Sequence, residues 1–273
     1  MTVHSSKYET KTYPGSRGGA GFVHPSAFWC RGVIALRKRP LWMPRALSFF
    51  VALHLGWLCG PANGDLFTGR AINAKGLLEY VETHEVQYEN GAISKSQTVY
   101  YDAANQKIGD LTSQYPLGPQ FGSYHFRDMR ADYEDGVQVS LDTIWMFRKK
   151  SDEDGQEERR LPREKDQIVG QGFHQFIVHH LEEIAQGEIF HVRLVLPSRL
   201  DQFKFRIRKR KIDGKTLHAR LEIDNWFLRL FAPHVDVAYD LETGYLLRYE
   251  GVSNLEDASG RHRKVTITYA YEE

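Results

Sequence analysis

Apolar and polar residues alternate along most of the chain from residue 79 onward, a pattern typical of β-strands with one buried face. Turn signals separate the alternating segments, and Asn-Gly and Asp-Gly pairs supply the positive φ angles that tight hairpins need. The predicted strands are 79–89, 93–101, 107–113, 123–134, 137–149, 188–196, 203–212, 215–224, 235–240, 245–252 and 263–271. The turn pairs are Asn90-Gly91, Ala104-Asn105, Asp135-Gly136, Asp154-Gly155, Asp213-Gly214, Thr243-Gly244 and Ser259-Gly260. Consecutive hairpins predict an antiparallel sheet, and the charged residues 151–163 predict a solvated loop.

One segment, residues 166–186, follows a helical period instead. Its apolar stripe consists of Val169, Phe173, Phe176, Ile177, Leu181 and Ile184. Gly187 predicts the C-terminal stop, and Gly170 and Gly172 weaken the first turn, so we expect the helix to begin near Phe173. A sheet of about ten strands curls, and a lone helix must bury its apolar stripe. We therefore predict an α+β fold in which a large, curved, half-barrel-like antiparallel sheet wraps one central amphipathic helix.

The N-terminal region predicts export. Met43-Pro44-Arg45 leads into an apolar run over residues 46–59, which is 14 residues long, whereas a membrane-spanning helix needs about 20. Small residues at Ala62 and Gly64 fit a signal-peptidase site. We predict a cleaved signal peptide at 43–64, one β-rich domain at 65–273 and periplasmic localisation. Residues 1–42 are interpreted as sequence upstream of the true start, with a transit peptide or an extended signal as alternatives.

Removing the signal changes the charge of the protein. The whole chain has 36 Lys and Arg and 35 Asp and Glu, and the first 64 residues hold eight of the basic residues and one of the acidic ones. The remainder has 28 basic and 34 acidic residues, a net charge of −6, which does not favour nucleic acid as a partner. Both cysteines, Cys30 and Cys59, precede residue 65. The predicted mature chain therefore lacks a disulfide, a cysteine nucleophile and cysteine metal ligands, and no cofactor is expected.

Histidines on the predicted helix are weak candidates for a metal site. His174 lies five and six positions from His179 and His180, whereas two histidines share one helical face at a spacing of four. His179 and Glu183 do have that spacing, but no third ligand accompanies them. His180 falls on the apolar stripe with Phe176. These two residues are predicted either to be core residues or to line a ligand cavity.

Alternation on strand 203–212 places Arg206 and Arg208 on one face and apolar residues such as Ile207 on the other. One interpretation is a solvated face whose cations pair with Glu222 or other acids on the next strand. The other is an anion site for a lipid headgroup, a phosphate or an acidic glycan, because arginine binds such groups through two parallel hydrogen bonds.

Residues 224–232 predict a short helix capped by Asp224 or Asn225 at the edge of the sheet. The segment carries Trp226, Phe227 and Phe231, an apolar load too large to leave entirely in water. Core packing, a flap over a ligand cavity and an edge that touches a membrane all remain open.

Five short strings carry a family resemblance: 196–200 (LPSRL), 226–231 (WFLRLF), 239–240 (YD), 247–251 (LRYEG) and 253–254 (SN). With them, residues 65–273 resemble an uncharacterised family of secreted proteobacterial proteins. The order of strands, helix and further strands is also similar to the half-barrel of periplasmic lipoprotein carriers. This second resemblance rests on architecture alone and transfers no site residues.

The function predicted from these observations is a non-enzymatic binding or carrier protein for a lipid-like or amphipathic ligand, such as a lipoprotein acyl chain. Its candidate ligand-binding residues are Phe176, His180, Arg206, Arg208, Trp226, Phe227 and Phe231. An envelope assembly factor that acts through a protein partner is the alternative. A hydrolase that uses His234 and Asp236 or the helix histidines is a third hypothesis, because two residues at i, i+2 of a strand point to the same face.

Overall fold

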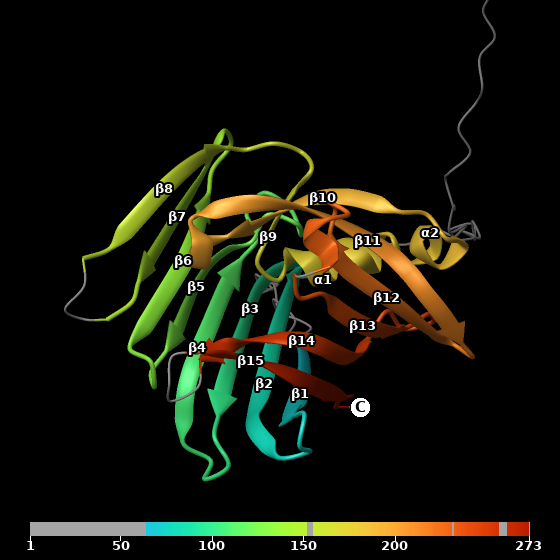
Figure 1. The fold of residues 1–273 in the computed structure, drawn as a ribbon, viewed down its shortest axis with the longest axis horizontal. Coiled ribbons are helices and arrows are strands. Elements are labelled where there is room, and N and C mark those ends of the chain that lie inside the picture. Colours follow the sequence, from blue (N-terminus) through green and yellow to red (C-terminus); the bar gives the residue numbers. More distant parts are fainter. Residues whose placement is uncertain (1–63, 152–154, 231, 257–260, 273) are drawn as a thin grey trace, which may run out of the picture. The chain divides into compact units, whose positions relative to one another are not determined.

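Residues 64–151, 155–230, 232–256 and 261–272 are described by the computed structural model, and they form one large sheet with short helices (Figure 1). All of them belong to a single unit that spans Trp57–Glu273. The predicted extension at 1–42, and the predicted signal peptide apart from Gly64, lie outside the described residues. Among the residues described, no helix has both the length and the apolar character needed to span a membrane.

The sheet is a series of hairpins. Its strands are β1 (Gly64–Asn73), β2 (Leu78–Glu89), β3 (Ala92–Tyr101), β4 (Lys107–Gln114), β5 (Ser123–Asp128), β6 (Tyr133–Val139), β7 (Thr143–Lys149), β8 (Glu157–Pro162), β9 (Gln167–Val169), β10 (Phe190–Leu196), β11 (Asp201–Asp213), β12 (Thr216–Ile223), β13 (Val235–Asp240), β14 (Leu246–Glu256) and β15 (His262–Tyr271). Across the sheet, the order starts with β8 at one edge and runs down in number to β1. Strand β1 pairs with β15, and from there the order runs down to β9 at the other edge. Neighbouring strands are antiparallel except β9 and β10, which are parallel. The predicted antiparallel sheet is confirmed.

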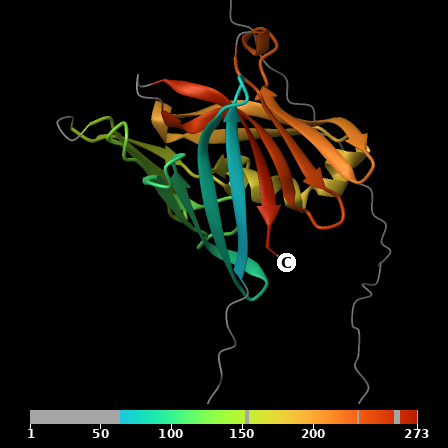
Figure 2. The ribbon, with the colours of Figure 1, turned by 90° about the horizontal axis from the view of Figure 1, so that it is seen from below.

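The two ends of this strand series approach each other because the sheet is curved (Figure 2). Phe121, just before β5, forms a parallel bridge with Val169 of β9. At the opposite end of β5, Asp128 Oδ2 accepts a hydrogen bond of 2.8 Å from the backbone N–H of Glu256 at the end of β14. Arg130 donates to the Glu256 carbonyl at 2.8 Å. Segments that are distant in the strand order are therefore joined, and the sheet has an inner and an outer face.

Cross-strand pairs define the inner face. Directly paired residues point to the same side of a sheet, and the register links one row of mostly buried residues across six strands. The row is Ala219 (β12), Val237 (β13), Tyr249 (β14), Ile267 (β15), Ala71 (β1) and Tyr80 (β2). Side chains two positions away from any member of this row also belong to the inner face.

The predicted helical segment is divided into α1 (Gly172–His179) and α2 (Leu181–Gln186). His180 between them has non-helical dihedral angles, φ −111° and ψ 26°. The helices pack on the inner face of β10–β13, and Ile177 and Ile184 are fully buried there. Gly187 ends α2 with a φ of 107°, as predicted. Enclosure of a single central helix by the sheet stays a prediction.

Several boundaries differ from the predicted ones. Helix α1 begins at Gly172, as predicted, and residues 167–169, at the start of the segment with helical period, form β9. Strand β1 was not predicted at all. The predicted loop at 151–163 contains β8, whose residues 157–160 are exposed and charged. Because β8 is the last strand on its side of the sheet, neither of its faces shows a readable apolar period.

The turn predicted at Asp135-Gly136 is wrong, because both residues lie inside β6. A Cβ atom on Gly136 would lie 2.5 Å from the Tyr124 carbonyl oxygen and 2.5 Å from the Phe147 ring. Glycine is required here for close packing and not for a turn. The chain reverses instead before β6, where Asp132 has a φ of 51°. The turns at Asn90-Gly91, Ala104-Asn105, Asp213-Gly214 and Thr243-Gly244 are confirmed, and Ser259-Gly260 lies outside the described residues.

Candidate functional site

The inner face changes character between β12 and β2. On β12 it presents Leu217 and Leu221 to the helices, and both are buried. On β2 it presents Tyr80, Glu82 and His84, of which Glu82 is 4% exposed. A carboxylate that is removed from water in this way needs partners, since burying an unpaired charge is costly. The surroundings of Glu82 therefore define the most polar part of the interior.

Glu82 lies opposite a glycine and beside an imidazole. Its register partner on β1 is Gly69, where a Cβ atom would lie 2.7 Å from the Glu82 side chain. Glycine at this position leaves the room that the carboxylate occupies. Oε1 of Glu82 lies 3.0 Å from Nε2 of His84, although Nε2 is buried without the geometry of a hydrogen bond. Among the residues described here, Glu82 has no ion pair with lysine or arginine.

The imidazole of His84 is oriented by residues from β3 and from the start of α1. Its Nδ1 lies 3.0 Å from the Thr98 hydroxyl, and the same hydroxyl accepts a hydrogen bond of 3.1 Å from Gln171 Nε2. Gln171 is fixed in turn by Ser96, which donates to its Oε1 at 2.7 Å. Because Thr98 accepts from Gln171, its own proton is available to His84 Nδ1. An imidazole that accepts this proton at Nδ1 has its own hydrogen on Nε2, the nitrogen that faces Glu82.

Tyrosines from four strands, β2, β3, β14 and β15, lie near the Glu82 carboxylate. Burial raises the pKa values of Tyr80, Tyr100, Tyr249 and Tyr269, and the negative charge of Glu82 raises each of them further. Tyr269 also lies within hydrogen-bonding reach of Glu82. These phenols therefore stay protonated and act as neutral donors or as aromatic surface.

A column of stacked rings leads away from this point. Phe67 of β1 stacks on His84 with ring centroids 4.3 Å apart and 4° between the planes. Tyr271 of β15 stacks on Phe67, with ring centroids 4.7 Å apart, and on Tyr245, with ring centroids 3.9 Å apart. Tyr245 is 38% exposed, so the column runs from the polar interior to the surface. It crosses β2, β1 and β15, which are neighbours in the sheet.

On α1, His174 faces the same region. Its Nδ1 lies 3.0 Å from the hydroxyl of Tyr239. Burial, with a smaller contribution from His84, lowers the pKa of His174 to about 4. The imidazole is therefore neutral at physiological pH. The electrostatic interaction with His84 places the α1 side chain close to β2.

These inner residues are enclosed by protein, yet several remain in contact with solvent. Phe67, His84, His174 and Tyr269 are only partly buried, while Ala71 on the same face is fully buried. Burial still strongly shifts the pKa values of His174 and Tyr269. These side chains therefore lie on the inner face of the curved sheet and keep partial contact with solvent. We call Phe67, Glu82, His84, His174, Tyr269 and Tyr271 the inner aromatic surface.

The predicted binding residues divide among three other places. Phe176 and His180 meet Phe190 of β10, with His180 ring centroids 4.6 Å from Phe176 and 4.5 Å from Phe190. Nδ1 of His180 lies 3.5 Å from Glu183 Oε1. This pair thus forms an aromatic cluster in the interior and is not brought together with the predicted arginines.

Arg206 and Arg208 lie on the outer face of β11, as their alternation predicted, and both pair with Glu222 of β12. Nε of each donates to Glu222 Oε1 at 2.8 Å, and Arg229 lies 3.8 Å from the same oxygen. Glu222 is 3% exposed. Burial opposes its ionisation, but hydrogen bonds from Arg208 and Arg206 outweigh this effect and lower its pKa to about 2. These hydrogen bonds confirm the predicted pairing of the two arginines with Glu222 on the next strand.

Trp226 and Phe227 are 73% and 55% exposed. The predicted short helix is a single 3-10 turn, η2 (Leu228–Leu230), and its expected cap is present. Asn225 Oδ1 accepts hydrogen bonds from the backbone N–H groups of Phe227 and Leu228 at 2.9 and 3.1 Å. Phe231 lies outside the described residues.

The catalytic and metal hypotheses receive little geometric support. His234 Nε2 lies 3.4 Å from Asp236, but the carboxylate of Asp236 accepts two hydrogen bonds of 2.6 Å from Arg220. Its orientation is therefore set by the arginine. Within the described part of the chain, no group of three or more His, Cys, Asp or Glu residues is arranged to hold a metal ion.

Sequence reasoning missed the inner aromatic surface. A signal was present on residues 80–84, where alternation places Tyr80, Glu82 and His84 on one face. Polar residues at successive inward positions of a predicted strand are the signature of a functional interior. The pairing of β2 with β1 could not be recognised because β1 was not predicted.

Comparison with known proteins identifies no family for this chain. No protein-family model matches the sequence, and no curated protein matches it. Among solved structures, the chain is similar to a beta-barrel-like protein of a domain of unknown function, DUF1849, from Brucella abortus. The identity is 7%, the match covers 78% of this chain and 98% of that chain, and the TM-score is 0.35. A similarity at this level carries no functional argument.

Proposed function

We propose that this protein is a non-enzymatic binding or carrier protein for an amphipathic, lipid-like ligand, exported to the periplasm and acting through its inner aromatic surface. The observation that carries the proposal is the set of inward-facing, partly exposed rings and polar groups on β1, β2, β15 and α1. Binding sites for small molecules are concave, mostly apolar, and contain a few fixed polar groups. The inner aromatic surface has this composition.

The two parts of the surface suit the two parts of such a ligand. The stacked rings of Phe67, Tyr271 and Tyr245 offer flat apolar area from the surface inward. At the inner end, Glu82 offers a carboxylate and His84 offers an imidazole. The hydroxyl of Thr98 orients that imidazole. An apolar chain along the rings and a polar end group at Glu82 would satisfy both environments.

Native mass spectrometry tests the proposal. The full chain is expressed in a bacterial host, and the recovered protein is weighed before and after denaturation. We expect a releasable mass of lipid size, and a polypeptide mass that corresponds to cleavage after Gly64. A protein that is consistently empty, and that does not take up a fluorescent alkyl amphiphile with an ammonium head group, would contradict the binding function. A retained N-terminus would contradict the predicted export signal alone.

Two neighbouring positions on β1 provide a matched pair of variants. Phe67 belongs to the inner aromatic surface, whereas Leu66 is 49% exposed and is its neighbour along the strand. We expect Phe67→Ala to weaken binding of this ammonium amphiphile at least tenfold, because a stacked ring contributes on the order of 1.5–3 kcal/mol of apolar burial. Leu66→Ala should leave binding unchanged. Equal affinities of the two variants would exclude the ring column from the site.

The alternative, an envelope assembly factor that acts through a protein partner, draws on the exposed residues Trp226 and Phe227. It predicts an interior that holds no ligand. Close to these two residues lie Arg206, Arg208 and Arg229, and positive charge beside exposed aromatic side chains suits an anionic lipid surface. The carrier role is therefore our conclusion.

A further inference from the structure

Three consecutive large apolar residues are exposed at one place on the outer side of the sheet. Trp226, Phe227 and Leu228 are 73%, 55% and 50% exposed. Single exposed apolar residues are ordinary, but a contiguous group indicates an interaction surface. We call residues 224–229 the Trp226 loop. It follows β12 and is the coil at the top of Figure 2.

The Trp226 loop is held in a fixed conformation. Besides the Asn225 cap, the backbone N–H of Arg229 donates to the Asn225 carbonyl at 3.0 Å. The Arg229 guanidinium donates to the carbonyls of Ile223 at 3.0 Å and Asp224 at 2.6 Å. These bonds tie the loop to the end of β12. Its exposed side chains are thus presented by an ordered backbone, which lowers the entropic cost of binding.

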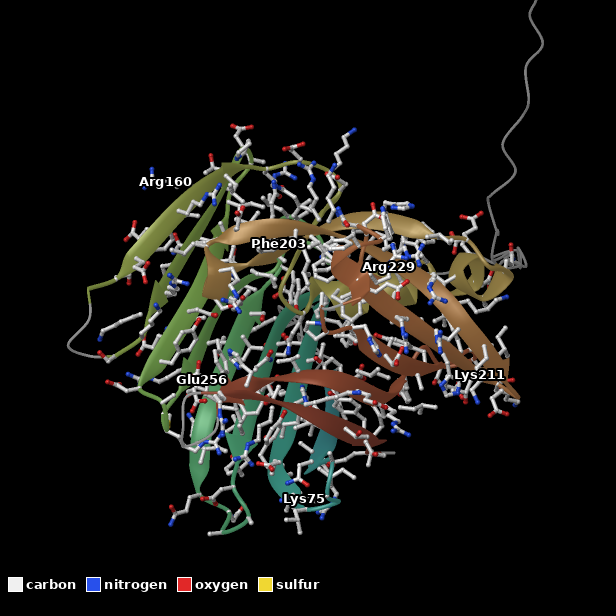
Figure 3. All side chains as sticks on the ribbon, in the orientation of Figure 1. Lys75, Arg160, Phe203, Lys211, Arg229 and Glu256 are labelled. Carbon is white, nitrogen blue, oxygen red and sulfur yellow. The ribbon has the colours of Figure 1, made fainter. Side chains whose placement is uncertain are left out.

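Positive charge lies directly beneath the exposed side chains. Arg229 connects the loop to the Glu222 cluster, which contains Arg206 and Arg208. The backbone N–H of Asp224 donates a hydrogen bond of 3.0 Å to the Lys204 carbonyl, which places β11 beside the loop. Phe203 of β11 and Arg229 of the loop are labelled in Figure 3. Four cations, Lys204, Arg206, Arg208 and Arg229, thus accompany two acids, Glu222 and Asp224. The local charge is +2, whereas the chain after residue 64 has a net charge of −6.

Arg208 retains hydrogen-bonding capacity toward an anion. Arg206 uses both Nε and one terminal nitrogen on Glu222, and Arg229 uses the same two positions on backbone carbonyls, so each of them has one further terminal nitrogen. The bond from Arg208 to Glu222 uses Nε, and the terminal NH groups are not needed for it. The side chains of Arg206, Arg208 and Arg229 are 25%, 26% and 23% exposed. Guanidinium groups with free edges at a surface bind phosphate oxygens well.

We propose that the Trp226 loop and the cations beside it form a docking surface for an anionic phospholipid membrane. Trp226, Phe227 and Leu228 enter the headgroup layer, where aromatic side chains are favoured. Arg206, Arg208 and Arg229 contact lipid phosphates, each adding attraction to an anionic surface. This surface lies on the outer side of the sheet, so the proposal does not depend on ligand binding at the inner aromatic surface.

Vesicle co-sedimentation tests the docking surface. The probes are vesicles of phosphatidylethanolamine and phosphatidylglycerol at 3:1, and vesicles of phosphatidylcholine alone. The full chain is compared with the double variant Trp226→Ser/Phe227→Ser and with Leu141→Ser, which alters a residue that is 69% exposed between β6 and β7. All three proteins share residues 1–63, so any contribution of that segment is common to them.

We expect the unaltered chain to bind the anionic vesicles at least tenfold more strongly than phosphatidylcholine, with weakening in 0.5 M salt. The double variant should lose at least tenfold in vesicle affinity, and Leu141→Ser should lose none. Equal binding by the double variant and the unaltered chain would overturn the proposal. So would sedimentation velocity that shows a dimer lost in the double variant, since the loop would then bind a second copy of this chain.

Discussion

Glu222 is buried among three arginines on the outer face of the sheet, and its replacement by glutamine measures what that arrangement contributes to folding. Its Oε1 accepts hydrogen bonds from Arg206 and Arg208 at 2.8 Å. Glu222→Gln keeps the size and an acceptor oxygen but removes the negative charge. The arginines then lose their counter-ion, and removal of one partner from a buried pair is strongly destabilising.

The size of the effect follows from the pKa of Glu222, which is lowered from 4.5 to about 2. A difference of about 2.5 units corresponds to roughly 3 kcal/mol of folding free energy at pH 7. Because the folded pKa is the lower one, this stability is fully present above pH 4.5 and is lost as pH falls through 2. By the same relation, less than half of it, about 1.4 kcal/mol, remains at pH 3.

Urea unfolding, followed by far-UV circular dichroism at pH 7, 4.5 and 3, provides the measurement. We expect Glu222→Gln to be about 3 kcal/mol less stable than the unaltered chain at pH 7, and the difference to shrink by pH 3. Glu242→Gln is the control, because Glu242 is 63% exposed and pairs at 2.8 Å with the exposed Lys215. That control should change stability by less than about 1 kcal/mol. A Glu222→Gln difference that does not vary with pH would refute the linkage to this carboxylate.

Two further predictions concern β6. Gly136→Ala should lower the free energy of unfolding by about 3 kcal/mol or prevent folding, because the new Cβ would lie 2.5 Å from the Tyr124 carbonyl oxygen. Gly155→Ala, where a Cβ has no neighbour, should leave stability unchanged in the same urea titration. Equal stability of the two variants would contradict the close packing at Gly136. Burial raises the pKa of Asp135 from 3.8 to about 6, against the hydrogen bond from Tyr133. The folded state then binds the proton more tightly, so the unaltered chain should lose up to about 3 kcal/mol between pH 4 and 7 relative to Asp135→Asn. A constant difference between these two proteins over that range would show that Asp135 is not protonated in the fold.

The sequence predicted the elements whose residues have one consistently apolar face. Strand β12 and the helix stripe are examples, since Leu217, Leu221 and Ile177 are all buried as their spacing requires. It failed where packing overrides a local signal. Asp135-Gly136 has the composition of a turn but lies in a strand, because Tyr124 and Phe147 from neighbouring strands approach it. Such contacts join residues that are distant along the chain, and no local pattern encodes them.

The candidate site shows the same division. The pairing of Arg206 and Arg208 with Glu222 was predicted, because adjacent strands of a hairpin have a register that the turn fixes. The inner aromatic surface was not predicted, because it depends on the contact between Phe67 of β1 and Tyr271 of β15, the first and last strands of the described chain. A contact between the two ends of a domain depends on the closure of the whole sheet.

The proposed binding function would give the polar residues of the inner face a physical reason. On β12, the face is built from Leu217 and Leu221, which are buried and need no polar partner. On β2, the same face holds Glu82 and His84, although apolar residues there would generally be neutral or stabilising. Stability alone therefore does not account for a carboxylate opposite Gly69, a position where a side chain would collide with it. A ligand whose polar end meets Glu82 gives that arrangement a physical reason, and the same ligand would explain why the adjoining rings remain open to solvent.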